Sequence, residues 1–505
     1  MATIADKLTT IAGIKTDIRT AINGKGGSLT SGSPFSAYSA AISSLPSGGG
    51  GYPPDWSEIG YTGTPQAVLD GFSYAKNIHD NWDPTVTNLW AKFSGNTSLV
   101  YMPFVDTSNA TKMQSMFQRC TNLVCLPLFD TSNVTNMTHM FHDASGLTSA
   151  SIPLFDTSKA GDMSYMFQGC TGLTTVPAFN TSACTNMGSM FRECSGLTSV
   201  PQFDTSNVTN MSEMFMFCYG LTSVPLFDTS SVTNMKSMFE SCRSLTTVPL
   251  LDTSSVTNMQ SMFSGCSGLT TVPAFNASAC TNMEGMFSGC TRLSAVPVFN
   301  TLACTNMRVM FYGCSGLTTV PAINTSACTN MPGMFQNCSG LTTVPQFDTS
   351  KVADMEFMFD GCRNLTSIPA LNTSEVWRMQ YMFNNCLSLE KITSLDMSKC
   401  TAFINMFGYG NMPNIRFMLL KGLGTPIGTT SYDGSRMYGC SNWGVDSTDI
   451  PDARQSLVDS LLTYSFDRAT AGYATCTIKL SSDSYNQLTA QELADIQAKG
   501  YNITT

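Results

Sequence analysis

Residues 210–230 read NMSEMFMFCYGLTSVPLFDTS, and this stretch recurs along most of the chain with small changes. Its most regular part is the dipeptide Met-Phe, whose Phe lies at positions 117, 141, 167, 191, 215, 239, 263, 287, 311, 335, 359, 383 and 407. Phe93 lies one period earlier, and the period is 24 residues throughout, with one two-residue insertion near Ala150–Ser151. A short period repeated this often is typical of a solenoid, in which each unit buries its apolar face against the next.

Within one repeat, the apolar residues predict two kinds of element. The segment Met211–Cys218 has them at i, i+3, i+4 and i+7, which predicts a short helix that begins near Thr209. The segment Leu221–Val224 predicts a brief strand, which ends at Pro225 because proline cannot donate to a ladder. Asp228 predicts a turn closed by its own side chain. Together these elements predict an α/β repeat solenoid, with a short parallel strand and a short helix in every repeat.

The repeat resembles the BspA-like leucine-rich repeat of bacterial surface proteins. The resemblance rests on the pattern Met-Phe-x-x-Cys-x-x-Leu-Thr-Ser-Val-Pro-x-Phe-Asp-Thr-Ser-x-Val-Thr-Asn-Met and covers roughly residues 83–410. It implies a leucine-rich-repeat solenoid used for adhesion or recognition, with no common catalytic residues. The Val-Pro dipeptide departs from the longer leucine-rich strand of many members of that family.

The composition argues against several classes of protein. The 505 residues include 26 Lys and Arg against 35 Asp and Glu, a net charge of −9, so no nucleic-acid partner is expected. We find no apolar run long enough for membrane insertion and no secretory signal at the first residues, so we expect a chain made in a reducing cytoplasm. Only three His occur, which makes a His-based metal centre or acid–base site hard to assemble.

Two columns of cysteine follow the repeat, three and seventeen residues after the motif Phe. A metal ladder or a set of disulfides is one interpretation. Small buried side chains are the favoured one, because Ala144 replaces Cys in the first column and Val208 and Val232 replace it in the second. No metal and no cofactor is therefore expected. The columns comprise Cys120, Cys170, Cys194, Cys218, Cys242, Cys266, Cys290, Cys314, Cys338, Cys362 and Cys386, and Cys184, Cys280, Cys304, Cys328 and Cys400.

A further column carries Asp at the turn that follows the brief strand. Calcium binding is one interpretation of stacked carboxylates. Asn180, Asn276, Asn300, Asn324 and Asn372 fill the same column, however, and a turn-closing hydrogen bond explains both residue types. The Asp residues are Asp106, Asp130, Asp156, Asp204, Asp228, Asp252 and Asp348.

Partner contacts are expected where the repeat varies on its outer surface. The position two before the motif Phe is predicted to face outward, and several other positions depart from the pattern with an apolar side chain. The alternative is packing against the termini, or isolated apolar residues on the surface. Thr222 and Ser223 and their equivalents predict a polar, uncharged concave face suited to neutral sugars. The candidate contact residues are Tyr165, Met216, Phe217, Tyr219, Tyr312, Phe357, Trp377 and Tyr381.

The flanks are assigned to separate regions. Residues 1–47 are predicted to form a helical hairpin for attachment or oligomerisation, and the segment 18–42 resembles a small module of bacteriophage tail, fibre and head-decoration proteins. Residues 48–54 form a Gly/Pro linker, 55–82 an N-terminal cap, 83–410 the solenoid and 411–505 a C-terminal capping region. The candidate attachment helix carries a stripe of Ile4, Leu8, Ile11, Ile18 and Ile22.

Within the C-terminal region, Pro451 is expected to begin a helix and residues 476–480 alternate as a strand. Thr489–Glu492 forms a capping box before a second helix, which Gly500 ends. A strand, a helix and a strand in this order predict a terminal capping repeat.

The favoured function is a bacteriophage virion protein of the fibre or decoration type. Its hairpin would contact other virion proteins, with a homo-oligomer as a further alternative, and its solenoid would bind a host-surface glycan or protein. The alternative is a leucine-rich-repeat adhesin at the bacterial cell surface. An enzyme is not expected, since we find no nucleophile elbow, phosphate loop or zinc spacing, although a tail-fibre depolymerase would also use carboxylates.

Overall fold

The computed structural model describes residues 77–403, 405–408, 415, 417–421, 453–463, 465, 469, 476–480 and 482–505. The predicted hairpin 1–47, with Ile4, Leu8, Ile11, Ile18 and Ile22, lies outside the described residues, and so do the linker 48–54 and most of the predicted cap 55–82. All the described residues belong to one compact unit of the chain.

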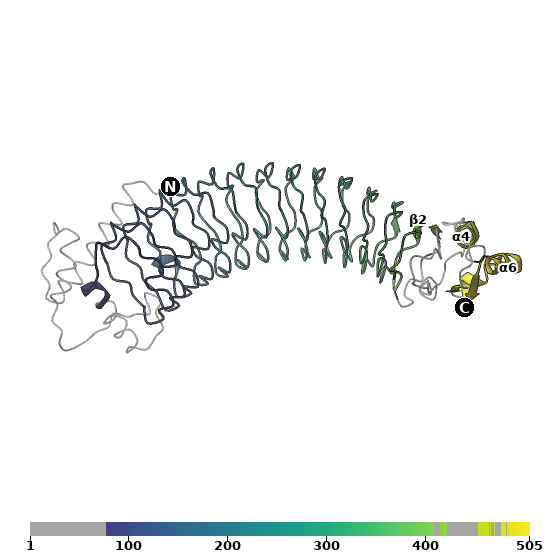
Figure 1. Cartoon of the computed structure of the whole chain (residues 1–505), viewed down its shortest axis with the longest axis horizontal. Helices are drawn as coiled ribbons and strands as arrows, with labels where there is room; N and C mark the ends of the chain where they lie inside the picture. The colour runs from purple at the N-terminus through teal and green to yellow at the C-terminus, as the bar shows by residue number, and fades with distance from the viewer. Residues whose placement is uncertain are drawn as a thin grey trace. The chain divides into compact units, whose positions relative to one another are not determined.

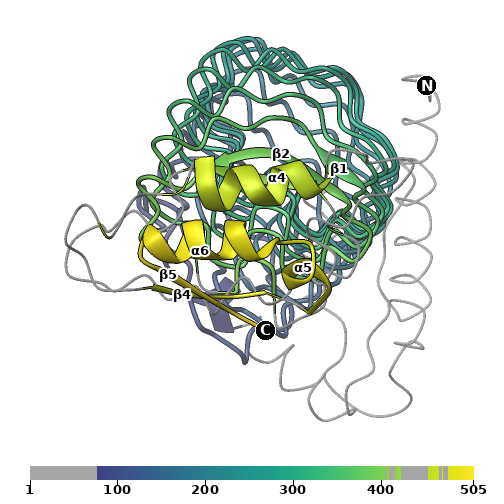
Figure 2. The same ribbon diagram turned by 90° about the vertical axis from the view of Figure 1, so that its right-hand side faces the viewer.

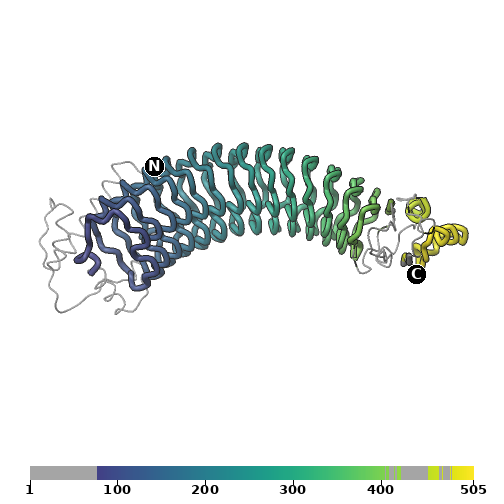
Figure 3. Tube along the Cα trace, viewed as in Figure 1, coloured from purple at the N-terminus to yellow at the C-terminus, as the bar shows by residue number. Residues whose placement is uncertain are grey.

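The repeats wind into a stack of rungs that lie side by side in chain order (Figures 1 and 3). Parallel bridges join the same position of neighbouring rungs, as in Asn186↔Asn210 and Asn210↔Asn234, and similar bridges recur from Asn88 to Ala402. The two-residue insertion forms a short 3-10 helix, η2 (Ser149–Ser151), without breaking the stack. The prediction of a repeat solenoid is therefore confirmed.

The helix predicted in each rung is wrong. The segment Met211–Cys218 folds as consecutive turns, in which the Met216 N–H donates to the Glu213 carbonyl three residues earlier at 3.1 Å. Glu213 and Phe217 have φ values of 58° and 61°, and this left-handed conformation interrupts a right-handed helix. The turns still place every third or fourth side chain inside, which is why the apolar spacing is the same as that of a helix.

Backbone hydrogen bonds between rungs replace those of the expected helix. The Met211 N–H donates to Asn234 O at 3.1 Å, and the Phe215 N–H donates to Met238 O at 2.9 Å. Each rung is therefore held to the next along this segment by main-chain bonds that do not depend on side-chain identity.

Among the described rungs, the predicted strands form at the C-terminal end of the stack, and a single parallel bridge, Tyr101↔Cys125, joins the extended segments of the first two rungs. At the C-terminal end, β1 (Ser367–Ile368), β2 (Lys391–Asp396) and β3 (Phe417–Lys421) make a parallel sheet in the order β1-β2-β3. Each preceding rung has a proline at the position that Thr393 occupies in β2. In the rung of β1 this residue is Pro369, and β1 ends just before it. Proline has no N–H to donate, so the extended segments of the other rungs are not paired as strands. The prolines are Pro103, Pro127, Pro153, Pro177, Pro201, Pro225, Pro249, Pro273, Pro297, Pro321, Pro345 and Pro369.

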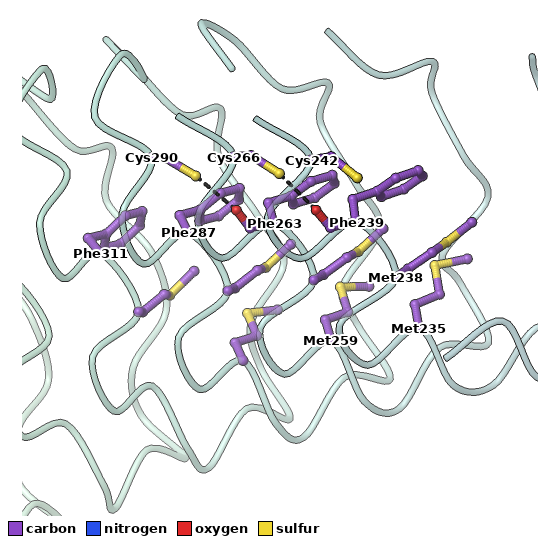
Figure 4. Packing of buried hydrophobic residues seen from close by; sticks show 14 of the residues in the cluster. Met235, Met238, Phe239, Cys242, Met259, Phe263, Cys266, Phe287, Cys290 and Phe311 are labelled. Atoms are coloured by element: carbon purple, nitrogen blue, oxygen red, sulfur yellow. Dashed lines mark hydrogen bonds between the residues drawn. The ribbon is translucent and has the colours of Figure 1, made fainter. Parts of the chain in front are cut away.

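The core is a set of side-chain columns that run along the stack. The rings of the motif Phe stack on one another, and Phe263 lies 5.6 Å from Phe239 and 5.7 Å from Phe287 between ring centroids. Figure 4 shows these rings in line, with the Met and Cys columns beside them. A second Phe, such as Phe275, comes from the extended segment and contacts the same column at 5.8 Å. Full burial of each such ring contributes roughly 1.5–3 kcal/mol.

Residues from outside the repeats cover the first and the last rung that the structure describes. At the first rung, the Trp82 ring lies 6.5 Å from Phe93 and its Nε1 donates to Asp106 O at 2.7 Å. At the last rung, α4 (Ala453–Val458) and the π-helix η4 (Asp459–Thr463) pack on β3. The Ser460 hydroxyl accepts the Leu420 N–H at 2.9 Å, so a helix satisfies part of the edge strand.

The remaining C-terminal elements include the strand, helix and strand expected from the sequence, and one short helix, α5, that was not expected (Figure 2). The strand β4 (Cys476–Lys479) is followed by α5 (Ser482–Tyr485), α6 (Ala490–Ala498) and β5 (Tyr501–Thr504), and β4 pairs with β5 in parallel. Thr489 and Glu492 form the predicted capping box of α6. No helix in the described part of the chain has the length and apolar character that a membrane span requires.

Candidate functional site

Each rung presents two long faces to solvent. In the rung of Phe215, we name Thr209–Cys218 the turn face and Leu221–Phe227 the proline face, and the same names apply to the equivalent residues of every rung. The connecting turn Asp228–Val232 joins them. The core lies between the two faces, since the Phe215 ring of one is 6.3 Å from the Phe227 ring of the other.

The predicted cysteine columns are part of this core. In the first column each thiol faces a main-chain carbonyl of the preceding rung, and Cys266 Sγ donates to Phe239 O at 3.0 Å (Figure 4). Burial raises the pKa of Cys266 and of Cys304, in the second column, to about 12. A thiol that keeps its proton at neutral pH is a poor nucleophile and metal ligand, so this environment agrees with the packing interpretation.

The aspartate column closes turns as predicted. Asp228 Oδ1 accepts the Ser230 N–H at 3.1 Å and the Ser230 hydroxyl at 2.7 Å, and these hydrogen bonds lower the pKa of Asp228. The sequence analysis missed the buried column of Thr beside it. The Thr229 hydroxyl donates to Asp252 O of the next rung at 2.7 Å, which ties neighbouring connecting turns together.

The predicted contact residues lie on or beside the turn face, in separate groups along the stack. Phe357 and Tyr381 stack on each other with ring centroids 5.0 Å apart, and Phe217 and Tyr219 lie 6.1 Å apart. The expected outward orientation two before the motif Phe is only partly correct. Tyr165, Phe357 and Tyr381 are half-buried because each ring packs on a neighbouring rung. Met216 is half-buried too, whereas Tyr312 and Trp377 are exposed.

Cations cover two of these rings. The Arg243 guanidinium lies 4.7 Å from the centroid of the Tyr219 ring, and that of Arg378 lies 5.8 Å from Trp377. Arg378 also pairs with Glu356 at 3.0 Å. Contacts of this kind stabilise the rings within the molecule and reduce the aromatic surface left for a partner.

Two of the three histidines lie together on the turn face. His139 Nδ1 is 3.1 Å from His142 Nδ1, and His142 Nδ1 also contacts Gln118 Nε2 at 3.0 Å. The His139 ring stacks on Tyr165 at 4.5 Å. Burial lowers the pKa of both imidazoles, so both are neutral at neutral pH. The sequence analysis noted that His is scarce and missed this pairing.

Large apolar side chains are exposed in one column of the proline face. The residue after each proline lies between that half-buried proline and a buried residue such as Phe227, so it faces away from the core. Six of these residues are 57–65% exposed, namely Phe104, Leu128, Leu154, Leu226, Leu250 and Val298. We call this column, with the prolines beside it, the proline ridge. The proline face was predicted to be polar and uncharged, and this is only partly correct. Thr222 and Ser223 are exposed as predicted, but they lie beside the apolar proline ridge.

Comparison with known protein families matches the rungs. The family model described as "Mycoplasma protein of unknown function, DUF285" matches residues 87–197, 171–267, 197–295, 246–344 and 329–416. No curated protein matches the sequence.

Three of the similar solved structures are bacterial leucine-rich-repeat proteins. One from Bacteroides ovatus shares 18% identity over 61% of this chain and 81% of its own, with a TM-score of 0.37. A leucine-rich cell surface protein from Faecalibacterium prausnitzii shares 19% over 62% and 86%, with a TM-score of 0.40. One from Eubacterium ventriosum shares 18% over 66% and 92%, also with a TM-score of 0.40.

None of these comparisons supports the bacteriophage resemblance of residues 18–42. The family model covers more than half of the chain, and its overlapping matches follow the rungs from the first to the last. The chain therefore belongs to the family described as Mycoplasma protein of unknown function, DUF285.

Proposed function

We propose that this chain is a non-catalytic recognition protein of the bacterial cell surface, which binds a protein partner along the proline ridge. The observation that carries the proposal is the ridge itself, where large apolar side chains are exposed in register on the three successive rungs of Phe104, Leu128 and Leu154 and again on the two rungs of Leu226 and Leu250. Extended apolar surface on a protein marks a site of interaction. A family described from Mycoplasma fits the bacterial alternative of the sequence analysis, and the virion interpretation has no comparable support.

The ridge has the chemistry of a protein-binding surface. Neighbouring rungs are about 4.8 Å apart, so the side chains of Phe104, Leu128 and Leu154 on three successive rungs form a continuous strip. The column contains no charged residue, which favours an apolar protein surface over a nucleic acid or a polysaccharide. The buried residues on either side of each ridge position and single main-chain bonds between extended segments, such as that from the Val124 N–H to Val100 O at 3.0 Å, hold the strip in place, which limits the conformational entropy lost on binding.

The side chains that catalysis would need are engaged in the architecture. The carboxylates of the aspartate column accept hydrogen bonds within their turns, and the column thiols are buried and protonated. The two neutral imidazoles, His139 and His142, hydrogen-bond to each other. This arrangement supports binding rather than chemistry as the task of the solenoid.

The test uses the bacterium that makes the chain. A membrane-impermeant biotin reagent is expected to label the chain on intact cells, and deletion of the gene is expected to reduce attachment to the surface that the bacterium colonises. The wild-type gene should restore attachment, whereas Leu226→Ser with Leu250→Ser should not. Ala274→Ser with Ala322→Ser is the matched control, because these residues occupy the same column with little side chain to lose. A chain shielded from the reagent, a chain recovered in purified phage particles, or full restoration by the leucine variant would overturn the proposal.

A further inference from the structure

A groove crosses the turn face of the first three rungs, on the opposite side of the core from the proline ridge. It has a volume of about 370 Å³ and is lined mainly by Trp90, Lys112, Gln114, Asn136 and His139. This volume lies in the lower part of the range of ~300–1,000 Å³ that is typical of small-molecule sites. We call it the Trp90 groove.

Trp90 supplies an open aromatic surface. Its side chain is 66% exposed, and the equivalent positions of the next rungs hold Gln114, Thr138 and Ser164. Trp377, by contrast, has the Arg378 guanidinium over its ring. No ring or cation contact of Trp90 occurs among the residues that the structure describes.

Next to Trp90, the column of Asn side chains on the turn face is interrupted. Farther along the turn face two pairs of these amides bond between rungs: Asn210 Nδ2 donates to Asn186 Oδ1 and Asn330 Nδ2 donates to Asn306 Oδ1, both at 3.0 Å. In the second rung Lys112 takes the place of Asn. Asn136 therefore has no such amide before it. Its Oδ1 accepts the Thr138 N–H and hydroxyl at 2.9 and 2.8 Å, which leaves its Nδ2 as a donor.

Gln114 supplies the matching acceptor. Its Oε1 is buried and makes no hydrogen bond within the described part of the chain. A buried amide oxygen without a partner costs roughly 1–3 kcal/mol, and a turn of the half-buried Gln114 side chain toward the groove would let a ligand donate to this oxygen and recover that energy. The groove thus holds an aromatic surface, a free donor, a free acceptor and one cation.

We infer that the Trp90 groove binds one pyranose ring of a glycan. A pyranose has an apolar face of C–H groups, which packs on an indole, and a rim of hydroxyls, each of which both donates and accepts hydrogen bonds. Amide donors and acceptors beside an exposed Trp match both parts. A nucleotide would also stack, but Lys112 is the only Lys or Arg that lines the groove, and phosphate binding relies on several cations.

Lys112 makes a further distinction among pyranoses. Its ammonium group can donate to a hydroxyl or pair with a carboxylate, and an acidic sugar gains more from it. Among otherwise similar rings, a hexuronate or a sialate is therefore expected to bind more tightly than a neutral hexose. This site is independent of the ridge, and the ridge variants should leave it unchanged.

The experiment measures saturation-transfer NMR on the full chain with glucose, N-acetylglucosamine, glucuronate and N-acetylneuraminate as probes. At least one probe is expected to bind saturably. Trp90→Ala should weaken that binding by at least about tenfold, the equivalent of ~1.4 kcal/mol. Trp377→Ala is the matched control, an exposed Trp on the same face with its own cation, and should bind like the wild type.

Lys112→Met should remove the preference for the acidic probes and keep binding of the neutral ones. Circular dichroism melts of each variant show whether the fold is retained, which is expected because Trp90 and Lys112 are exposed. The inference fails if the folded wild type binds none of the four probes saturably, or if Trp90→Ala binds as tightly as Trp377→Ala. Either result would leave attachment through the proline ridge unaffected, so the two proposals fail separately.

Discussion

Raising the pH from 8 to 10 is expected to destabilise this solenoid strongly, because its core contains sixteen buried thiols in two columns. Burial raises the pKa of Cys280 and Cys328 to about 11 and that of Cys304 to about 12. The thiols of the unfolded chain titrate near 9.0. The folded state therefore holds these protons more tightly. The stability that they contribute is complete below pH 9 and is lost as the pH rises toward 11–12.

The size of the effect follows from the same shift. Between pH 8 and pH 10, a thiol that titrates only in the unfolded state lowers the free energy of unfolding by about 1.4 kcal/mol. Summed over both columns, the loss is on the order of 20 kcal/mol, which exceeds the ~5–15 kcal/mol that holds an ordinary domain together. Rungs that carry buried thiols are expected to unfold within this range of pH.

A variant of three neighbouring rungs isolates the contribution of the thiols. Cys280→Val, Cys304→Val and Cys328→Val together remove three titrating groups and introduce a residue that the same column already carries at Val232 and Val256. Between pH 8 and pH 10, the variant should lose about 4 kcal/mol less than the parent chain. The assay is guanidinium unfolding at pH 8, 9 and 10 with a phosphine reductant, followed by circular dichroism. Equal pH dependence of parent and variant, or a parent whose stability does not change, would refute the reasoning.

Two further predictions test the packing and the proline argument. Phe263→Ala removes a ring stacked between Phe239 and Phe287 and should cost roughly 3–5 kcal/mol in guanidinium unfolding; a loss under about 1 kcal/mol would contradict the stacked core. Pro369→Thr introduces an amide beside Thr393, which should extend β1 by one residue. This amide should exchange its hydrogen more slowly than an unstructured amide, and the free energy of unfolding should change by less than about 1 kcal/mol. Exchange of this amide as fast as that of an unstructured amide would contradict the argument.

The core columns could be predicted from the sequence because each position repeats the same kind of residue. The path of the backbone could not be predicted in the same way. Apolar residues at i, i+3, i+4 and i+7 show only which side chains face inward, and turns with left-handed residues produce the same spacing as a helix. A signal was nevertheless present two residues after the motif Phe. That position is often Gly or Asn, the residues that favour positive φ, which argues against a helix. Positive φ occurs there at Gly95, Gly169, Gly265, Gly289, Gly313, Asn337, Gly361 and Asn385.

The candidate sites were harder to predict, for different reasons. The exposure of Leu226 depends on the three-residue spacing of its buried neighbours Val224 and Phe227, which becomes visible only when the extended path is known. Trp90 lies in the first repeat, which is irregular because Lys92 stands in place of the motif Met. The groove at Trp90 is completed by Lys112 and Gln114 of the next rung, and this neighbourhood is not apparent from the sequence. Departures from the repeat at Tyr219 and Trp377 are apparent in the sequence, but the cations that cover them are not.

The ladders that build the solenoid also determine where it can recognise a partner. The Thr209 hydroxyl donates to Thr185 O and the Thr222 hydroxyl to Thr198 O, both at 3.2 Å, so these two columns of recurring Thr are engaged by the neighbouring rung. Such columns therefore offer fewer free polar groups to a ligand. Free groups occur where a ladder is interrupted, as at Lys112, or at positions that no ladder uses, as at Leu226. Changes at such exposed positions alter stability by only about ±0.5 kcal/mol, so the binding surface can vary while the stack is retained.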